Sequence, residues 1–185
     1  MEQREPRKRI PISKHMQQVI VDPLEFKKNK SSDKARNITS INERISIELW
    51  FDKHYIDRNQ HGDEDGKRNG IDNTMVEALV LQSVKHLLFY SACVKNFTFL
   101  NHTEIGNTGR VNRIVCQRVT DDGMLNVAIE AHYKSLKEYE ITVKTAMCTD
   151  DFKLGDNQYV VEISGDDSSI LKCMINRKVT EICSI

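Results

Sequence analysis

Two side chains able to move a proton and hold a phosphate lie close together in the segment HYIDR. His54 and Arg58 are four residues apart, so they share one face if this short segment is a helix. A histidine exchanges protons near neutral pH, and an arginine binds phosphate through a fixed fork of donors. The pair therefore fits phosphodiester chemistry. The competing interpretation is a surface histidine beside an arginine paired with Asp57 or Glu77, because His-x-x-x-Arg is a short pattern.

Cleavage of RNA without a metal needs three groups. A base must deprotonate the 2′-hydroxyl, a cation must stabilise the charged phosphorane, and an acid must protonate the leaving oxygen. His54 suits the first or third role, and Arg58 suits the second. The spacing of these two residues does not by itself decide between this chemistry and a surface pair.

Other motifs for catalysis and cofactor binding are missing from the chain. The segment HYIDRNQHGDED is rich in histidines and acids, but it contains no H-E-x-x-H and lacks most ligands of a calcium loop. We therefore expect no metal. The sequence also has no G-x-x-x-x-G-K-[ST], no G-x-G-x-x-G and no G-x-S-x-G, which disfavours kinases, NTPases, Rossmann dehydrogenases and esterases. No cofactor is expected.

Composition indicates a protein of the cytoplasm. No apolar run approaches the roughly 20 residues that a bilayer requires, and the basic N-terminus is unlike a secretory signal. The five cysteines are scattered without a C-x-x-C pair, so we expect reduced thiols.

Charge is distributed unevenly along the chain. Residues 1–40 hold ten Lys and Arg against five Asp and Glu, whereas residues 121–185 hold seven Lys and Arg against twelve Asp and Glu. The basic arm is either a nucleic-acid contact or a solvated tail.

The elements that must position the candidate residues follow from periodicity. Residues 45–51 alternate as a half-buried strand, and residues 61–70 form a polar loop. Residues 72–94 carry apolar side chains at helical spacing, and either Asp72 or Asn73 can cap this helix. Short turns then separate segments of strand character, which favours an antiparallel meander. These segments are 97–100, 112–119, 124–133, 139–147, 158–163, 170–175 and 179–185.

The predicted fold class is α+β. We expect a basic arm over residues 1–40 and one domain over residues 41–185, in which an N-terminal strand and helices pack on an antiparallel sheet meander. Residues 157–185 form either part of this sheet or an added hairpin extension.

The run FDKHYIDR, followed by a loop and by GIDNTMVEAL, resembles the pattern around the catalytic histidine of phage RegB-type endoribonucleases. It is similar also to the wider RelE-like, or BECR, ribonuclease fold, in which a His-x-x-x-Arg helix precedes a second helix with a Gly-Ile start. The resemblance covers residues 45–90. It implies that His54 is the catalytic histidine and that Arg58 lies beside it.

The same resemblance implies phosphate-binding residues in the central strands. The segment YEITVKTAM is reminiscent of such folds, and Lys144 is the preferred second cation. Arg113, Arg118 and Thr142 are the candidate RNA contacts. On a strand, Thr142 and Lys144 should point together, as should His132 and Lys134. The alternative for all of these residues is the polar outer face of a half-solvated sheet.

One position departs from the RegB-type pattern. The second catalytic histidine of such enzymes falls near Leu81, and His86 is the nearest substitute on the same helix. The leading prediction is a metal-independent endoribonuclease. Its expected partner is RNA, either free or as mRNA on the ribosome, and a protein partner or antitoxin is a further expected partner. The alternative is a non-catalytic binding or inhibitor protein of a phage or mobile element that uses its acidic C-terminal region.

Overall fold

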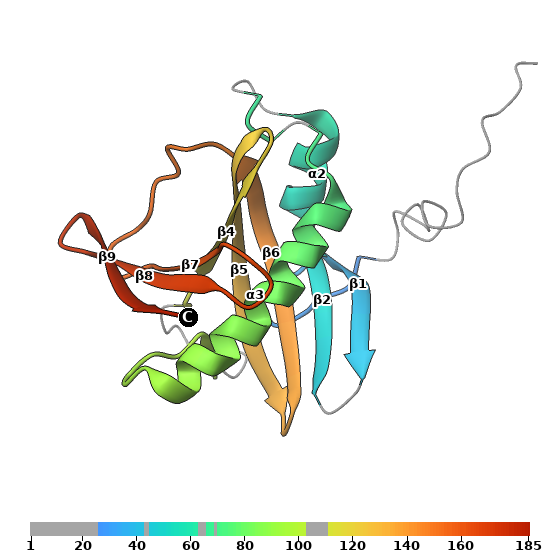
Figure 1. The fold of residues 1–185 in the computed structure, drawn as a ribbon. Helices are drawn as coiled ribbons and strands as arrows, with labels where there is room; N and C mark the ends of the chain where they lie inside the picture. Colours follow the sequence, from blue (N-terminus) through green and yellow to red (C-terminus); the bar gives the residue numbers. More distant parts are fainter. Residues whose placement is uncertain (1–25, 43–44, 63–65, 69, 103–110) are drawn as a thin grey trace, which may run out of the picture.

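The computed structural model describes residues 26–42, 45–62, 66–68, 70–102 and 111–185. Within these residues, strands β1 and β2 precede two helices, and the remaining strands follow them (Figure 1). The elements before the later strands are β1 (Ala35–Asn42), β2 (Ser46–Asp52), α2 (Lys53–His61) and α3 (Asn73–Cys93). The later strands are β3 (Leu100–Asn101), β4 (Ile114–Thr120), β5 (Gly123–Ser135), β6 (Glu138–Cys148), β7 (Tyr159–Ile163), β8 (Ser169–Ile175) and β9 (Lys178–Ser184).

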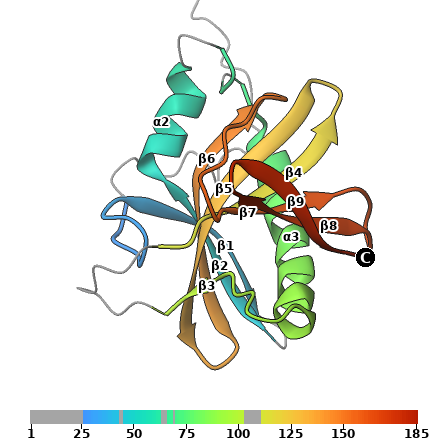
Figure 2. The ribbon, with the colours of Figure 1, turned by 90° about the vertical axis from the view of Figure 1, so that its left-hand side faces the viewer.

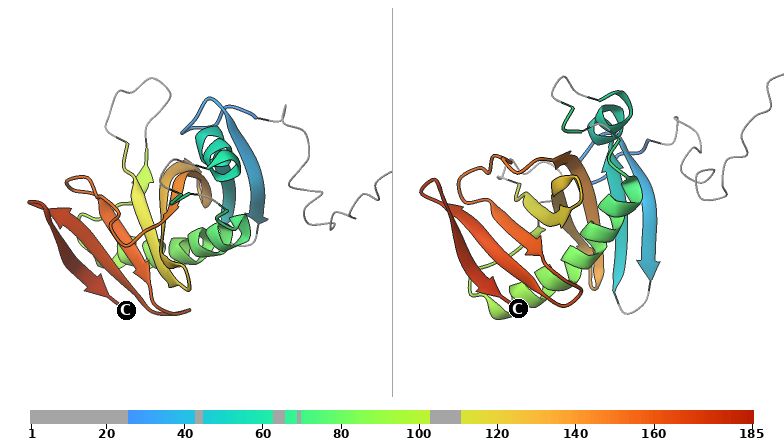
Figure 3. Two further views of the ribbon diagram at one scale, coloured as in Figure 1. Left: turned by 90° about the horizontal axis from the view of Figure 1, so that it is seen from above. Right: turned by 45° about the horizontal axis from the view of Figure 1, so that its top comes forward.

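All strands belong to one mixed sheet. Its order is β1-β2-β6-β5-β4-β7-β8-β9, and β3 pairs with β5 beyond the end of β4. Two antiparallel meanders, β4-β5-β6 and β7-β8-β9, meet where β4 runs parallel to β7, and β2 runs parallel to β6. The sheet twists strongly, so that β1 and β9 are splayed apart at its ends (Figure 3).

The α+β class is confirmed, whereas the expected antiparallel meander is only partly correct, because the sheet is mixed and mostly antiparallel. Short turns made the antiparallel pairs β4-β5, β5-β6, β7-β8 and β8-β9 predictable. The expected meander is wrong at β7, which pairs with β4 and not with β6, because the parallel pairs join segments far apart in the sequence. The helix expected over residues 72–94 is α3, and the segment HYIDR lies within α2. Strand β1 begins at Ala35, inside the segment expected as a basic arm; residues 1–25 of that arm lie outside the described part of the chain.

Helix α3 covers one face of the sheet and forms the core with it. Asp72 caps the helix by accepting from the backbone N–H of Thr74 at 2.9 Å. The helix lies diagonally across the strands in Figure 1 and contacts β4, β5 and β7. Its buried side chains, such as Leu79 and Leu87, join inward residues of the strands, such as Ile141, in one apolar cluster. Burial of this surface is the main force that holds the sheet and helix together.

The opposite face of the central strands is polar. In β5, Ile129 and Ala131 belong to the apolar core, so Glu130 and His132 point the other way. In β6, Ile141 and Val143 belong to the core, and the alternation sends Glu140 and Thr142 outward. We call this surface, with Asp52 and Lys144 at its end, the polar face.

Residues 27–34, here called the strap, lie over the polar face. Backbone hydrogen bonds in both directions between Lys27 and Ala35, at 2.8 and 2.9 Å, close the strap into a loop. The N–H of Lys53 donates to the carbonyl of Lys34 at 3.0 Å, which ties the end of the strap to the start of α2. Figure 2 shows this N-terminal segment beside α2, on the side of the sheet away from the β7-β8-β9 meander.

Candidate functional site

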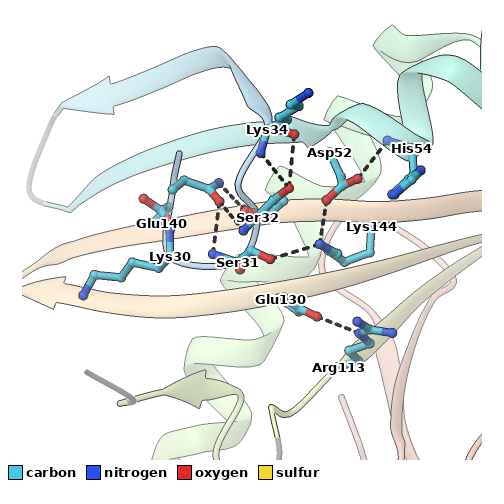
Figure 4. Close-up of polar contacts among 12 residues, drawn as sticks. Lys30, Ser31, Ser32, Lys34, Asp52, His54, Arg113, Glu130, Glu140 and Lys144 are labelled. Atoms are coloured by element: carbon cyan, nitrogen blue, oxygen red, sulfur yellow. Dashed lines mark hydrogen bonds and ion pairs between the residues drawn. The ribbon is translucent and has the colours of Figure 1, made fainter. Parts of the chain in front are cut away.

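An ion pair joins α2 to the polar face. Asp52 ends β2 and caps α2, because one carboxylate oxygen accepts from the backbone N–H of His54 at 2.8 Å. The other oxygen accepts from the ammonium of Lys144 on β6 at 2.6 Å (Figure 4). Burial opposes ionisation of Asp52, but hydrogen bonds from Lys144 and Ser32 outweigh it, so its pKa lies below the ordinary value. The start of α2 is therefore fixed to the sheet through one buried carboxylate.

Besides the hydrogen bond from Ser32 to Asp52, the strap makes polar contacts with β5 and β6. The Asn29 side-chain amide donates to the Thr142 hydroxyl at 2.6 Å, and the backbone N–H of Lys30 donates to the Glu140 carboxylate at 2.7 Å. The Lys30 ammonium donates to the carbonyl of Tyr133 at 2.6 Å, and Lys144 donates to the carbonyl of Ser31 at 3.1 Å. Figure 4 shows Lys30 and Ser31 of the strap beside Glu140 and Lys144 of β6.

Three titratable side chains are buried on the polar face, and one of them, Glu140, is bonded to the strap. Glu130, His132 and Glu140 are at most 4% exposed, and His132 lies directly opposite Glu140 across the β5–β6 pair. Burial lowers the pKa of His132, although the nearby Glu130 raises it; Lys30 and Lys144 lower it further. Burial raises the pKa of Glu140 despite the hydrogen bond from the Lys30 backbone. These shifts favour an imidazole that is neutral near pH 7 and a carboxyl that holds its proton more tightly than usual.

Four of the residues chosen from the sequence lie at or near the polar face. His54 and Arg58 are exposed on α2, as the four-residue spacing predicts. Thr142 and Lys144 both contact the strap, which confirms that they point to the same side. Figure 4 shows His54 and Lys144 on either side of Asp52.

Arg113 lies at the rim of the same face. Its guanidinium Nε donates to Glu130 at 2.6 Å, and its side chain is about half exposed while that of Glu130 is buried. The pair extends the polar face toward the start of β4. An open pocket of about 350 Å³ adjoins this rim, lined in part by Asn112, Arg113 and Tyr159.

Two further candidates lie on the other side of the sheet. His86 is buried between α3 and β8, where its Nδ1 lies 3.0 Å from the Ser169 hydroxyl. Arg118 donates to Gln82 of α3, on the apolar side of β4. The sheet therefore separates His86 and Arg118 from Lys144. The helical periodicity around His86 does not reveal which side of the sheet the helix covers. For this reason the sequence could not exclude His86 from the candidate site.

The sequence reasoning missed three carboxylates of the polar face, Asp52, Glu130 and Glu140. Asp52 had a usable signal, because an aspartate directly between a strand and a helix is a preferred N-cap. Glu130 and Glu140 interrupt apolar strands, as in NVAIEAHY. A charged residue in such a strand indicates either a solvated face or a buried polar site, and only the position of the strap distinguishes the two.

The chain was compared with protein-family models, curated proteins and solved structures, and none of the three comparisons gives a match. Among the described residues, no helix has the length and apolar character needed to cross a membrane. Within the same residues, His, Cys, Asp and Glu do not gather in groups of three or more that could hold a metal ion.

Proposed function

We propose that the chain is a metal-independent endoribonuclease that cleaves RNA by attack of a 2′-hydroxyl on the adjacent phosphate. The observation that carries this proposal is the Asp52 carboxylate, which holds the first turn of α2 and the ammonium of Lys144 together. The start of α2, which carries the exposed His54 and, one turn further on, the exposed Arg58, is thus fixed next to a lysine from the sheet. The order of a strand, two helices and a three-stranded meander also agrees with the RelE-like resemblance of residues 45–90.

In this reaction His54 takes the proton from the 2′-hydroxyl or returns one to the leaving 5′-oxygen. Its ring is exposed, so a substrate can reach it without rearrangement of the core. Arg58 offers its guanidinium fork to the phosphate oxygens. The ammonium of Lys144 carries three N–H donors. Among the described residues, Asp52 and Ser31 accept two of these hydrogen bonds, so the third donor can face the phosphorane. The products are a 2′,3′-cyclic phosphate and a 5′-hydroxyl.

The test is cleavage of single-stranded RNA and of ribosome-bound mRNA in the presence of a chelator. We expect fragments that end in a 2′,3′-cyclic phosphate, and a 2′-deoxy nucleotide at the cleaved position should block the reaction. His54→Ala should slow cleavage by about 100-fold or more, which is the usual contribution of a proton-transfer group. His61→Ala is the matched control, because His61 is an exposed histidine at the far end of the same helix. Intact RNA after prolonged incubation, or equal rates for His54→Ala and the parent, would contradict the proposal.

A second candidate function is binding of a protein partner through β9. This strand ends the sheet and, in the described chain, pairs with β8 alone. Its side chains Val179 and Ile182 are 52% and 38% exposed. An exposed strand edge can accept a strand from another chain. Growth after expression separates the two functions, since an active ribonuclease should arrest growth and His54→Ala should restore it, whereas a binding module should show neither effect.

A further inference from the structure

Next to the strand residues that hold the strap lies a buried histidine, His132, which has no hydrogen-bond partner among the described residues. Both ring nitrogens of His132 are buried without a hydrogen bond to any group of the described chain, and the residue is 2% exposed. A neutral imidazole carries one donor and one acceptor, and buried polar groups are nearly always paired. The polar face therefore holds a side chain equipped for proton transfer whose hydrogen-bonding capacity is unused.

The strap itself is attached by polar contacts alone. Its sequence, KKNKSSDK, contains no apolar residue, so no hydrophobic burial by its own side chains holds it on the sheet. Asn29 is its central anchor: the amide donates to Thr142, while the amide oxygen accepts from the backbone N–H groups of Ser31 and Ser32 at 3.0 and 2.8 Å. The chain on one side of the strap is fixed, because Ala35 is fully buried at the start of β1. Such a segment can be lifted without opening the apolar core.

The groups that the strap occupies are suited to a polar chain. Thr142 and Glu140 accept hydrogen bonds from the strap, and Lys144 donates one to its Ser31 carbonyl. A single strand of RNA offers the same mixture of donors and acceptors along its length, with phosphates for Lys144 and Arg113. Lys144 also contacts Asp52, which caps α2 next to His54, so a strand of RNA in place of the strap would meet both histidines.

We propose that the strap is a displaceable cover, and that His132 and Glu140 beneath it form a second proton-transfer site, which single-stranded RNA reaches by taking the place of the strap. The part that concerns RNA rests on the proposed ribonuclease function. At this site the imidazole of His132 takes the proton of a 2′-hydroxyl, and the resulting imidazolium returns it to the leaving 5′-oxygen, so the proton count balances over one cleavage. His132 lies four residues further back along the sheet than Asp52, so it serves a different phosphodiester of the bound strand from the one that His54 serves. Glu140 lies opposite His132 across the strand pair, and departure of the strap frees its carboxylate to accept a hydrogen bond from the ring and orient it.

Accessibility of His132 tests the cover directly, without any need for catalysis. Diethyl pyrocarbonate modifies exposed neutral imidazoles, and peptide mass spectrometry reads each histidine separately. The variant Asn29→Ala/Lys30→Ala removes the side-chain anchors of the strap, and Lys28→Ala is the control, because Lys28 pairs with Asp33 on the solvent side. We expect His132 to react roughly tenfold faster or more in the double variant, since each lost hydrogen bond shifts such an equilibrium by roughly fivefold.

Two other histidines make this result unambiguous. His54 is exposed and should react at the same rate in all variants, whereas His86 is buried on the other side of the sheet and should stay protected. If His86 also becomes reactive, the double variant has lost its fold, and Thr142→Val then decides, because it removes the acceptor of Asn29 from the sheet side. Unchanged protection of His132 in a folded variant, or His132 as reactive as His54 in the parent, overturns the cover.

RNA then provides the second readout. An oligonucleotide with 2′-deoxy sugars, which cannot attack its own phosphate, should protect His132 in the double variant and leave His86 unaffected; failure to protect overturns the RNA site. In end-labelled RNA, His132→Gln should slow the cut that His132 serves by about 100-fold and leave the cut that depends on His54 unchanged. If the parent cleaves RNA and neither His132→Gln nor the double variant changes its rate, this inference fails and the ribonuclease function stands. If His132 opens and is protected by RNA but no variant cleaves, the ribonuclease function and the catalytic role of His132 fail, while the cover and the RNA-binding site beneath it stand.

Discussion

Replacement of Lys144 by methionine should measure how strongly the polar face holds α2. The substitution keeps an unbranched side chain of similar length but leaves the 3% exposed carboxylate of Asp52 without its cation. Loss of one partner from a buried ion pair costs about 3–5 kcal/mol. Asp52 keeps the His54 N–H, and the Lys144 side chain is 17% exposed, so we expect a smaller loss of about 2–3 kcal/mol in the free energy of unfolding.

Urea unfolding at pH 7 is the assay, because Trp50 is the only tryptophan and lies on β2 two residues before Asp52. Lys134→Met is the matched control. Lys134 pairs with Glu48 at 2.8 Å, but both side chains are about one-third exposed, so the loss should be about 1 kcal/mol or less. An equal loss for the two substitutions would refute the reasoning.

The pH dependence of the Lys144→Met effect gives a further check. The pKa of Asp52 in the folded chain lies below its ordinary value of 3.8, so the stabilisation is complete above that pH and is lost as the pH falls through the folded-state pKa. The difference between parent and variant should therefore shrink at low pH. In an Asp52→Asn background, Lys144→Met should have a much smaller effect, and an undiminished effect there would mean that Lys144 acts through another group.

Two other predictions concern buried groups. The pKa of His132 lies below 6.5 in the folded chain, so the contribution of its neutral imidazole to stability is complete above pH 6.5 and is lost as the pH falls. His132→Gln should therefore flatten the decline in unfolding free energy between about pH 7 and pH 5. A decline as steep as that of the parent would show that His132 is not the group that titrates. Among the cysteines, exposed Cys93 should react with a thiol reagent at least about 100-fold faster than Cys116, which is buried and whose pKa is raised to about 12. Peptide mapping of the labelled native protein checks this order, and early labelling of Cys116 would contradict it.

The sequence predicted local structure well because turns and alternation are local. The DDG turn before β5 places Gly123 at φ 109°, and the turn between β8 and β9 places Asn176 and Arg177 at φ 51° and 63°, conformations that glycine and asparagine adopt most readily. Helix α3 was predictable from its apolar spacing and its cap at Asp72. The pairing of β2 with β6 and of β4 with β7 could not be predicted, because the side-chain pattern of a strand does not identify the strand that lies beside it.

The candidate site was predictable only in part, for the same reason. His54, Arg58, Thr142 and Lys144 were chosen from local spacing, and the structure places them around one end of the sheet. Whether His86 or His132 belongs with them depends on which face of the sheet α3 covers. That choice is made by long-range packing of residues such as Leu79 and Ile141, and no local pattern encodes it.

The parallel pairs in the sheet also determine how the chain folds. The β4-β5-β6 meander joins neighbouring segments, so its formation closes only short loops. Pairing of β2 with β6 brings residues 46 and 138 together, so it closes a long loop. Closing a long loop costs more chain entropy and slows folding. We expect the meander and α3 to form first and β2 to dock late, bringing with it the start of α2. Asp52 and Lys144 then meet only in the last steps of folding, so the candidate site is assembled after the core that supports it.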